Sequence, residues 1–183
     1  FFLGTVFVAG FIRSMTNTLR SVFITNELLL EKSVISNSIF FSVFPEIFLY
    51  FYSKKINQRI GIYWIFIIGH IAGIIRTFGC TFLRSSSKKN SYPNFPVYFC
   101  IIAFESFNGI NSSFVITSAT RIASDMAPKG MAFSAQGLVV GTLQGFSMTI
   151  ASLAGYLMVE AFDIRSTFIL SSLLGAVCVV LIL

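Results

Sequence analysis

Long apolar runs constrain this chain more than any other feature. Five segments, 35–53, 61–83, 96–119, 131–159 and 166–183, contain few charges and approach or exceed the ~20 residues that a helix needs to cross a bilayer. Charged residues make up 11% of the 183 positions, against about 25% in soluble domains. Since so few polar side chains cannot cover a water-facing surface, we predict an integral membrane protein whose partner is the lipid bilayer.

The first segment is ambiguous, because an apolar run over 1–12 is followed by charges. On a helix, Arg13, Asn17, Arg20 and Glu27 share one narrow face. A spanning helix would turn this face to the bundle interior or a watery cavity. The alternative is a short span that ends near Ile12, followed by an interfacial helix. We favour a spanning helix over about 1–26, since a dozen residues are too few to cross.

The predicted fold class is therefore an all-α multipass membrane protein with six transmembrane helices. The expected links are short and polar, which makes helices that follow one another antiparallel neighbours. They comprise residues 27–34, 54–60, 84–95, 120–130 and 160–165. Lys and Arg are balanced, five against five, between alternate links, so the positive-inside rule sets no orientation.

Several function classes are excluded by what the sequence lacks. The net charge of +6 is scattered without a basic stripe, which argues against nucleic acid as a partner. Cys80, Cys100 and Cys178 have no metal-ligand spacing, and HExxH, GxSxG and P-loop patterns are absent. We expect neither an enzyme nor a metal site, and no cofactor other than a proton or another coupling cation.

Ionisable residues inside spans are candidate functional residues, because lipid penalises them. Glu46 follows Pro45, which removes a backbone hydrogen bond, and Ser42 lies one turn earlier. A carboxylate beside loosened backbone suits proton or cation handling. A static salt bridge from Glu46 to Arg13 or Arg20 explains it equally well.

Glu105, Asn108 and Ser112 form a polar stripe on the fourth predicted helix, at positions i, i+3 and i+7. This exceeds what helix packing usually requires. We interpret the stripe as facing a substrate, with interhelical hydrogen bonding as the alternative. His70 is interpreted as a packing residue, and Arg76 as an arginine that extends toward the membrane surface.

Gly137, Gly141 and Gly145 recur every four residues on the fifth predicted helix, with Gln144 beside them. Such small-xxx-small spacing lets two helix backbones approach closely in lipid. We therefore predict a helix-packing surface here.

Residues 123–168 resemble the eleventh helix of the major facilitator superfamily and its flanks. The resemblance rests on Ala127-Pro128, on Gln136-Gly137-Leu138 and on the glycine-rich helix that follows. Arg59-Ile60-Gly61 resembles the end of the cytoplasmic loop between helices eight and nine, although that loop's usual acidic residue is missing. The nearest branch is the MFS-like one related to lactose permease and nucleoside:proton symporters.

This resemblance implies that residues 1–183 are the C-terminal six-helix half of a twelve-helix transporter, built from two inverted three-helix repeats (1–83 and 96–183). It places 54–60 and 120–130 in the cytoplasm and 84–95 outside. The first and fourth helices would line the path, with the second and fifth beside the N-terminal half. The third and sixth would be peripheral, which lowers the expected importance of His70 and Arg76. The glycines would form a sliding, gating surface.

The expected function is secondary active transport of a small polar solute by alternating access, coupled to protons and located in the plasma membrane or an organelle membrane. Arg13, Asn17, Arg20, Glu46, Glu105, Asn108 and Ser112 are the candidate path and coupling residues. The further partners are the small-molecule substrate and the N-terminal six-helix half. The alternative is a non-transporting receptor or interaction protein built on the same fold.

Overall fold

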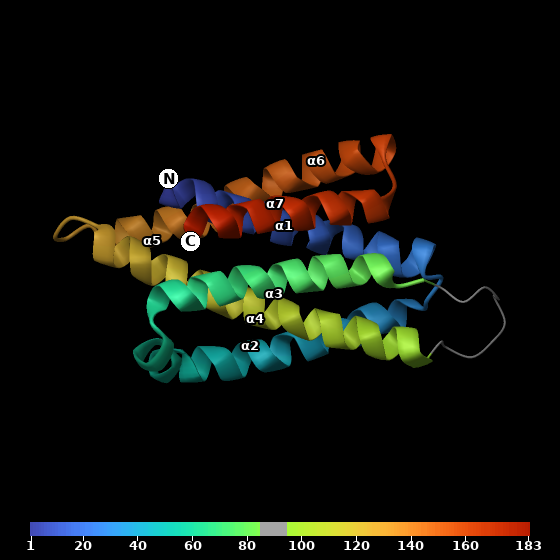
Figure 1. Cartoon of the computed structure of the whole chain (residues 1–183), viewed down its shortest axis with the longest axis horizontal. Coiled ribbons are helices and arrows are strands. Elements are labelled where there is room, and N and C mark those ends of the chain that lie inside the picture. The colour runs from blue at the N-terminus through green and yellow to red at the C-terminus, as the bar shows by residue number, and fades with distance from the viewer. Residues whose placement is uncertain (85–94) are drawn as a thin grey trace.

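The computed structural model describes residues 1–84 and 95–183, and their regular elements are all helical (Figure 1). Two of the helices contain a π-helical turn. The elements are α1 (Phe2–Val22) with η1 (Phe23–Glu27), α2 (Lys32–Ile60), α3 (Ile62–Phe82), α4 (Phe95–Met126), α5 (Ala132–Val140) with η2 (Gly141–Phe146) and α6 (Ser147–Ala161), and α7 (Ile164–Ile182).

Five helices are long and apolar enough to cross a membrane, namely those over Lys32–Ile60, Ile62–Phe82, Pro96–Met126, Ala132–Ala161 and Ile164–Ile182. The helix from Phe2 to Glu27 is not among them, but it is continuous and lies along the same axis (Figure 1). It does not break near Ile12, which favours one continuous first helix over a short span followed by a separate interfacial helix.

Two helices extend beyond the ends predicted from the apolar runs. α2 continues through 54–60, the expected link, and ends only at Gly61, whose φ of +89° suits glycine. Lys54, Lys55 and Arg59 are good helix formers, so the helix outlasts its apolar run. α4 likewise continues to Met126, just before Pro128. Apart from Arg84 and the backbone of Phe95, the predicted link 84–95 lies outside the described residues.

Most helices adjacent in sequence are not the main packing partners; the exceptions are α3 with α4 and α4 with α5. α1 packs chiefly against α6, η2 and α7, α2 against α4, and α3 against α7. Small residues allow these crossings. A Cβ at Gly10 would lie 2.7 Å from the Leu143 carbonyl oxygen, and one at Gly175 would lie 2.9 Å from Ile74 Cγ1. Close contact between small residues therefore decides the neighbours, rather than link length.

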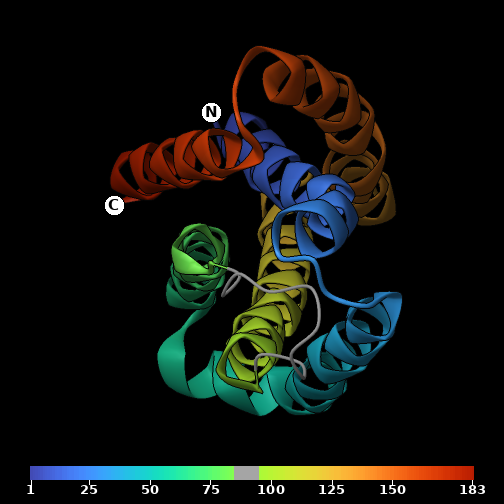
Figure 2. The ribbon, with the colours of Figure 1, turned by 90° about the vertical axis from the view of Figure 1, so that its right-hand side faces the viewer.

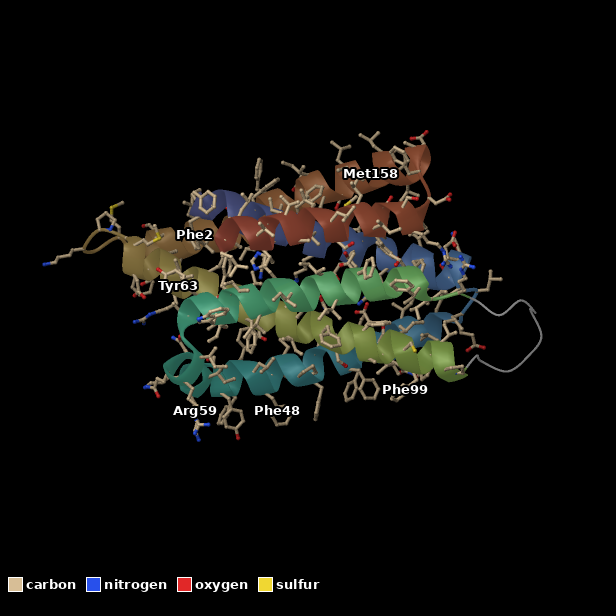
Figure 3. The ribbon with its side chains drawn as sticks, viewed as in Figure 1. Phe2, Phe48, Arg59, Tyr63, Phe99 and Met158 are labelled. Atoms are coloured by element: carbon tan, nitrogen blue, oxygen red, sulfur yellow. The ribbon has the colours of Figure 1, made fainter. Side chains whose placement is uncertain are left out.

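The helices leave much apolar surface exposed, as expected for contact with lipid. Aromatic side chains such as Phe48 and Phe99 project from the bundle (Figure 3) and are 51% and 64% exposed. Seen along the bundle, α3 and α7 lie on one side of α1, whereas α6 lies on the other (Figure 2). The long apolar helices over 32–60 and 132–161 are the least buried of the five.

α2 and α4 cross very closely where Gly109 of α4 meets Pro45 of α2. A Cβ at Gly109 would collide with the Ser42 carbonyl oxygen and would lie 3.0 Å from Pro45 Cγ. We expect Gly109→Ala to lower the free energy of unfolding by about 1–3 kcal/mol, because the backbones must separate. The unfolding temperature in detergent measures this.

Gly137→Ala is the matched control, because nothing lies within 4 Å of a Cβ at Gly137. It should leave stability unchanged or raise it by up to about 1 kcal/mol. Equal destabilisation by both substitutions would contradict the close crossing.

Candidate functional site

A buried ion pair between α3 and α4 forms the centre of the polar interior. Arg76 and Glu105 are each 2% exposed. The Arg76 Nη2 atom donates to both carboxylate oxygens of Glu105, at 3.0 and 3.1 Å, and Nε donates to Oε1 at 3.3 Å. Charge-assisted bonds of this kind are roughly twice as strong as neutral ones.

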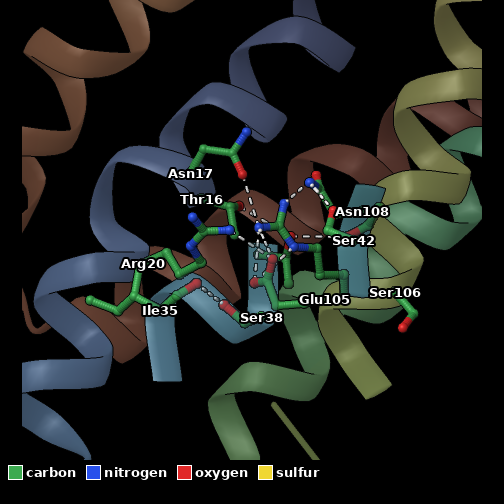
Figure 4. Close-up of polar contacts among 12 residues, drawn as sticks. Thr16, Asn17, Arg20, Ile35, Ser38, Ser42, Glu105, Ser106 and Asn108 are labelled. Atoms are coloured by element: carbon green, nitrogen blue, oxygen red, sulfur yellow. Dashed lines mark hydrogen bonds and ion pairs between the residues drawn. The ribbon is translucent and has the colours of Figure 1, made fainter. Parts of the chain in front are cut away.

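A second arginine, from α1, shares the same carboxylate (Figure 4). Arg20 Nη1 donates to Glu105 Oε2 at 2.9 Å, and its side chain is 16% exposed. Two guanidinium groups thus share one carboxylate, so the cluster keeps a net positive charge.

Two amides complete the coordination of Arg76. Asn17 Oδ1 on α1 accepts from Nη2 at 2.9 Å, and Asn108 Oδ1 on α4 accepts from Nη1 at 2.7 Å. Asn108 in turn donates to the Ser42 hydroxyl on α2 at 2.8 Å. The network therefore joins α1, α2, α3 and α4 through polar contacts, at a depth where apolar side chains surround it.

Glu46 lies in a separate polar contact between α2 and α4. The Ser112 hydroxyl donates to Glu46 Oε1 at 2.6 Å, and Tyr50 lies beside both groups. Arg20 pairs with Glu105 and not with Glu46. Arg13 lies within electrostatic range of Glu46 but forms no ion pair with a described residue. The Arg20 form of the static salt bridge to Glu46 was therefore wrong, and the Arg13 form is not present as a direct contact.

Pro45 loosens α2 directly before Glu46. A proline cannot donate to the carbonyl four residues earlier, here that of Phe41. The Ser106 hydroxyl on α4 approaches this oxygen at 3.5 Å, the limit of hydrogen-bonding distance. The Ser106 hydroxyl also has the Ile102 carbonyl oxygen of its own helix as a closer acceptor, at 3.0 Å, so the backbone before Glu46 stays loosely held.

His70 is buried on α3, with 4% of its surface exposed. Its Nδ1 atom bonds the Phe66 carbonyl oxygen at 2.8 Å, and its ring packs edge-on against Phe66. Its Nε2 atom has no partner among the described residues. It borders a cavity of about 20 Å³ that Arg13 and Asn111 also line, which is room for about one water molecule.

A comparison with known families assigns the chain. The family model for the Major Facilitator Superfamily matches residues 2–183. The chain belongs to the Major Facilitator Superfamily. No curated protein and no solved structure matches it. This match confirms, at the level of the superfamily, the resemblance seen in the sequence. Members of this superfamily are generally membrane transporters, which supports the prediction of an integral membrane protein.

Within this major-facilitator chain, the structure brings most of the predicted site residues into two groups. Arg20, Asn17, Glu105 and Asn108 meet around Arg76, whereas Glu46 meets Ser112. Arg13 forms no ion pair with either group, but it lines the small cavity together with His70 and Arg76 and lies within electrostatic range of Glu46. No three His, Cys, Asp or Glu side chains cluster as metal ligands within 1–84 and 95–183.

Arg76 is the residue that sequence reasoning missed. It does not extend to the membrane surface, because Glu105 and two amides hold it inside the bundle. Its assignment to a peripheral helix lowered its expected importance. A count of the charges in the predicted spans could have found Arg76. A buried arginine needs an acidic partner, and Glu46 and Glu105 are the acidic residues that these spans offer.

The glycine surface lies outside the packed interior of this chain. Gly137, Gly141 and Gly145 have open space where a Cβ would lie, and Gln144 is exposed. Gly141 and Gly145 lie in the π-helical turn η2, a feature that is frequent at functional sites. The surface that packs on α1 instead includes Leu143 and Ser147.

We expect Glu105→Gln to lower the free energy of unfolding by about 3–5 kcal/mol, because it leaves two arginines without their counter-charge. Arg76→Gln combined with Glu105→Gln should cost less than the sum of the single changes. Unfolding of the purified protein in detergent measures each value.

The control is the exposed pair on α4, Arg121 with Asp125, whose atoms lie 3.2 Å apart. Arg121→Gln should cost less than about 1 kcal/mol. Additive effects of Arg76→Gln and Glu105→Gln would contradict a shared ion pair.

Proposed function

We propose that this chain is the C-terminal six-helix half of a secondary active transporter that moves a small polar solute by alternating access. The observation that carries the proposal is a charged, hydrogen-bonded network inside a bundle whose family consists of membrane transporters. Burial of charge in a membrane protein is costly and usually marks a solute or ion pathway.

The packing pattern supports two inverted three-helix repeats. Exchange of α1, α2 and α3 with α4, the α5–α6 helix and α7 turns most principal contacts into one another; the contact of α4 with α5 has no comparable counterpart between α1 and α2. α1 packs on α6 as α4 packs on α2, and α1 packs on α7 as α4 packs on α3. The contact between α3 and α7 maps onto itself. Inverted repeats of this kind are typical of transporters whose two halves rock around a central site.

The exposed surfaces support a second six-helix bundle as the partner. In the bundle, α2 and α6 pack on different central helices and keep large apolar surfaces exposed. The N-terminal half would cover part of these surfaces and face the polar residues of α1 and α4. We place the protein in the plasma membrane, with an organelle membrane as the alternative, and in the branch related to lactose permease and nucleoside:proton symporters.

Glu46 is the proposed proton-coupling residue. It is half-buried, follows a proline in the helix and accepts one hydrogen bond from Ser112, whereas Glu105 is held by two arginines. A carboxyl with few fixed partners can exchange a proton more readily than one locked in an ion pair.

Glu46→Gln should abolish accumulation driven by a pH gradient while solute exchange across the membrane continues, because the amide cannot bind the coupling proton. Uptake into liposomes that contain the full-length protein measures both activities. Glu160→Gln, at the exposed end of α6, is the control and should behave as wild type. Proton dependence that survives both Glu46→Gln and Glu105→Gln would sink the coupling assignment.

The glycine surface is the proposed gating contact with the N-terminal half. Its small residues would let the α5–α6 helix slide as the site opens, and within residues 1–84 and 95–183 no described side chain fills the space beside them.

Gly141→Leu should slow transport at least about tenfold and leave the unfolding temperature within about 2 °C of wild type, since its side chain meets only the moving contact. Gly4→Leu, also with nothing within 4 Å, is the control. An equal loss of transport in both variants would argue against a specific sliding surface.

No observation favours a non-transporting receptor.

A further inference from the structure

The membrane interior of this chain carries more positive than negative charge. The predicted spans contain three arginines, Arg13, Arg20 and Arg76, and two glutamates, Glu46 and Glu105. Glu105 is shared by two of the arginines. Glu46 accepts from Ser112, and Arg13 has no ion pair among the described residues. One positive charge therefore has no counter-charge within these spans.

Unused hydrogen-bond donors gather on one face of α1. Arg13 makes no hydrogen bond to a described residue, and Arg20 Nε is buried without a partner there. Between them, Asn17 turns its carbonyl oxygen to Arg76 and its amide nitrogen away from the network (Figure 4). These residues are spaced i, i+4 and i+7 and are half-buried, so they span roughly 10 Å of one helix face.

The acceptors of the network around Arg76 are already occupied. Both oxygens of Glu105 and the Oδ1 atoms of Asn17 and Asn108 receive hydrogen bonds from arginine. A sugar hydroxyl needs acceptors as well as donors, and a cation needs oxygen ligands. A carboxylate or phosphate needs only donors, and guanidinium groups bind such oxyanions in a bidentate way.

We propose that the α1 face formed by Arg13, Asn17 and Arg20 binds an oxyanion, and that the transported solute is a small organic anion with a carboxylate or phosphate group. The transport part of this inference rests on the proposed function, whereas the binding part does not. The bound anion supplies the missing negative charge and receives donors that the protein leaves free. Arg13 is the principal ligand, because its guanidinium forms no direct ion pair with a described residue.

The test measures binding to the purified full-length protein by its unfolding temperature. Ligands that bind the folded state raise this temperature in a concentration-dependent way. The probes are inorganic phosphate and succinate, with succinamide as the uncharged counterpart of succinate and chloride added to equal ionic strength. We expect phosphate or succinate to raise the unfolding temperature and succinamide to leave it unchanged. Stabilisation by phosphate would indicate a phosphate group on the solute, and stabilisation by succinate would indicate a carboxylate.

Arg13→Gln should weaken anion binding at least about tenfold, the effect of losing one charge-assisted contact. Arg13→Lys should restore part of it, because the charge returns without the planar fork. Arg121→Gln, outside the site, should bind as wild type. Arg13 forms no direct ion pair with a described residue, so its variants are expected to fold.

Stabilisation by neither anion would overturn the anion site, as would stabilisation that Arg13→Gln leaves unchanged. The former result would assign the counter-charge to a carboxylate outside this chain, and the latter would place the bound anion elsewhere on the protein. Uptake into liposomes tests transport separately. Uptake of a neutral solute without anion binding would contradict the anion site but support the proposed transport function. Anion binding without any uptake would support the anion site and contradict the transport function.

Discussion

The ion pair between Arg76 and Glu105 is the interaction on which the polar interior depends. Each side chain is almost fully buried, and neither charge is tolerable there without the other. Their contact fixes α3 against α4, and Arg20, Asn17 and Asn108 then bring in α1 and α2. The same constraint aligns two amide groups, since each must present its oxygen to the guanidinium. It thereby sets which atoms remain free for a solute.

A static network and a moving transporter make different demands on the same helices. The side of α1 toward α6 is closely packed through Gly10, and α4 meets α2 through Gly109. These contacts have almost no room for an added carbon, so we expect them to move as units. The glycines of 137–145 show the opposite pattern, with open space beside each. The close contacts and the open surface therefore lie on different sides of this bundle, as the proposed rocking of rigid bundles would require.

Much of the architecture could be predicted from the sequence, because lipid imposes a strict rule on segment length and polarity. The five apolar runs all became helices of the structure. The stripe of Arg13, Asn17 and Arg20 also predicted a continuous first helix. The helix ends were less predictable, since Lys54, Lys55 and Arg59 are equally compatible with a link or with a helix that protrudes from the membrane. Gly61, with its positive φ, decides the actual end of α2.

The sequence by itself determined that this chain is a multipass membrane protein, which helices carry charge, and the superfamily that its motifs resemble. Periodicity along one helix is enough for those conclusions. Only the tertiary structure decided the partners: that Glu105 binds Arg76 and Arg20, that Glu46 binds Ser112, and that Arg13 has neither acid as a direct contact. The physical reason is that a stripe on a single helix specifies a direction but not what lies opposite. In this fold the residue that faces such a stripe belongs to a neighbouring helix, and close packing of small side chains determines which helix is the neighbour.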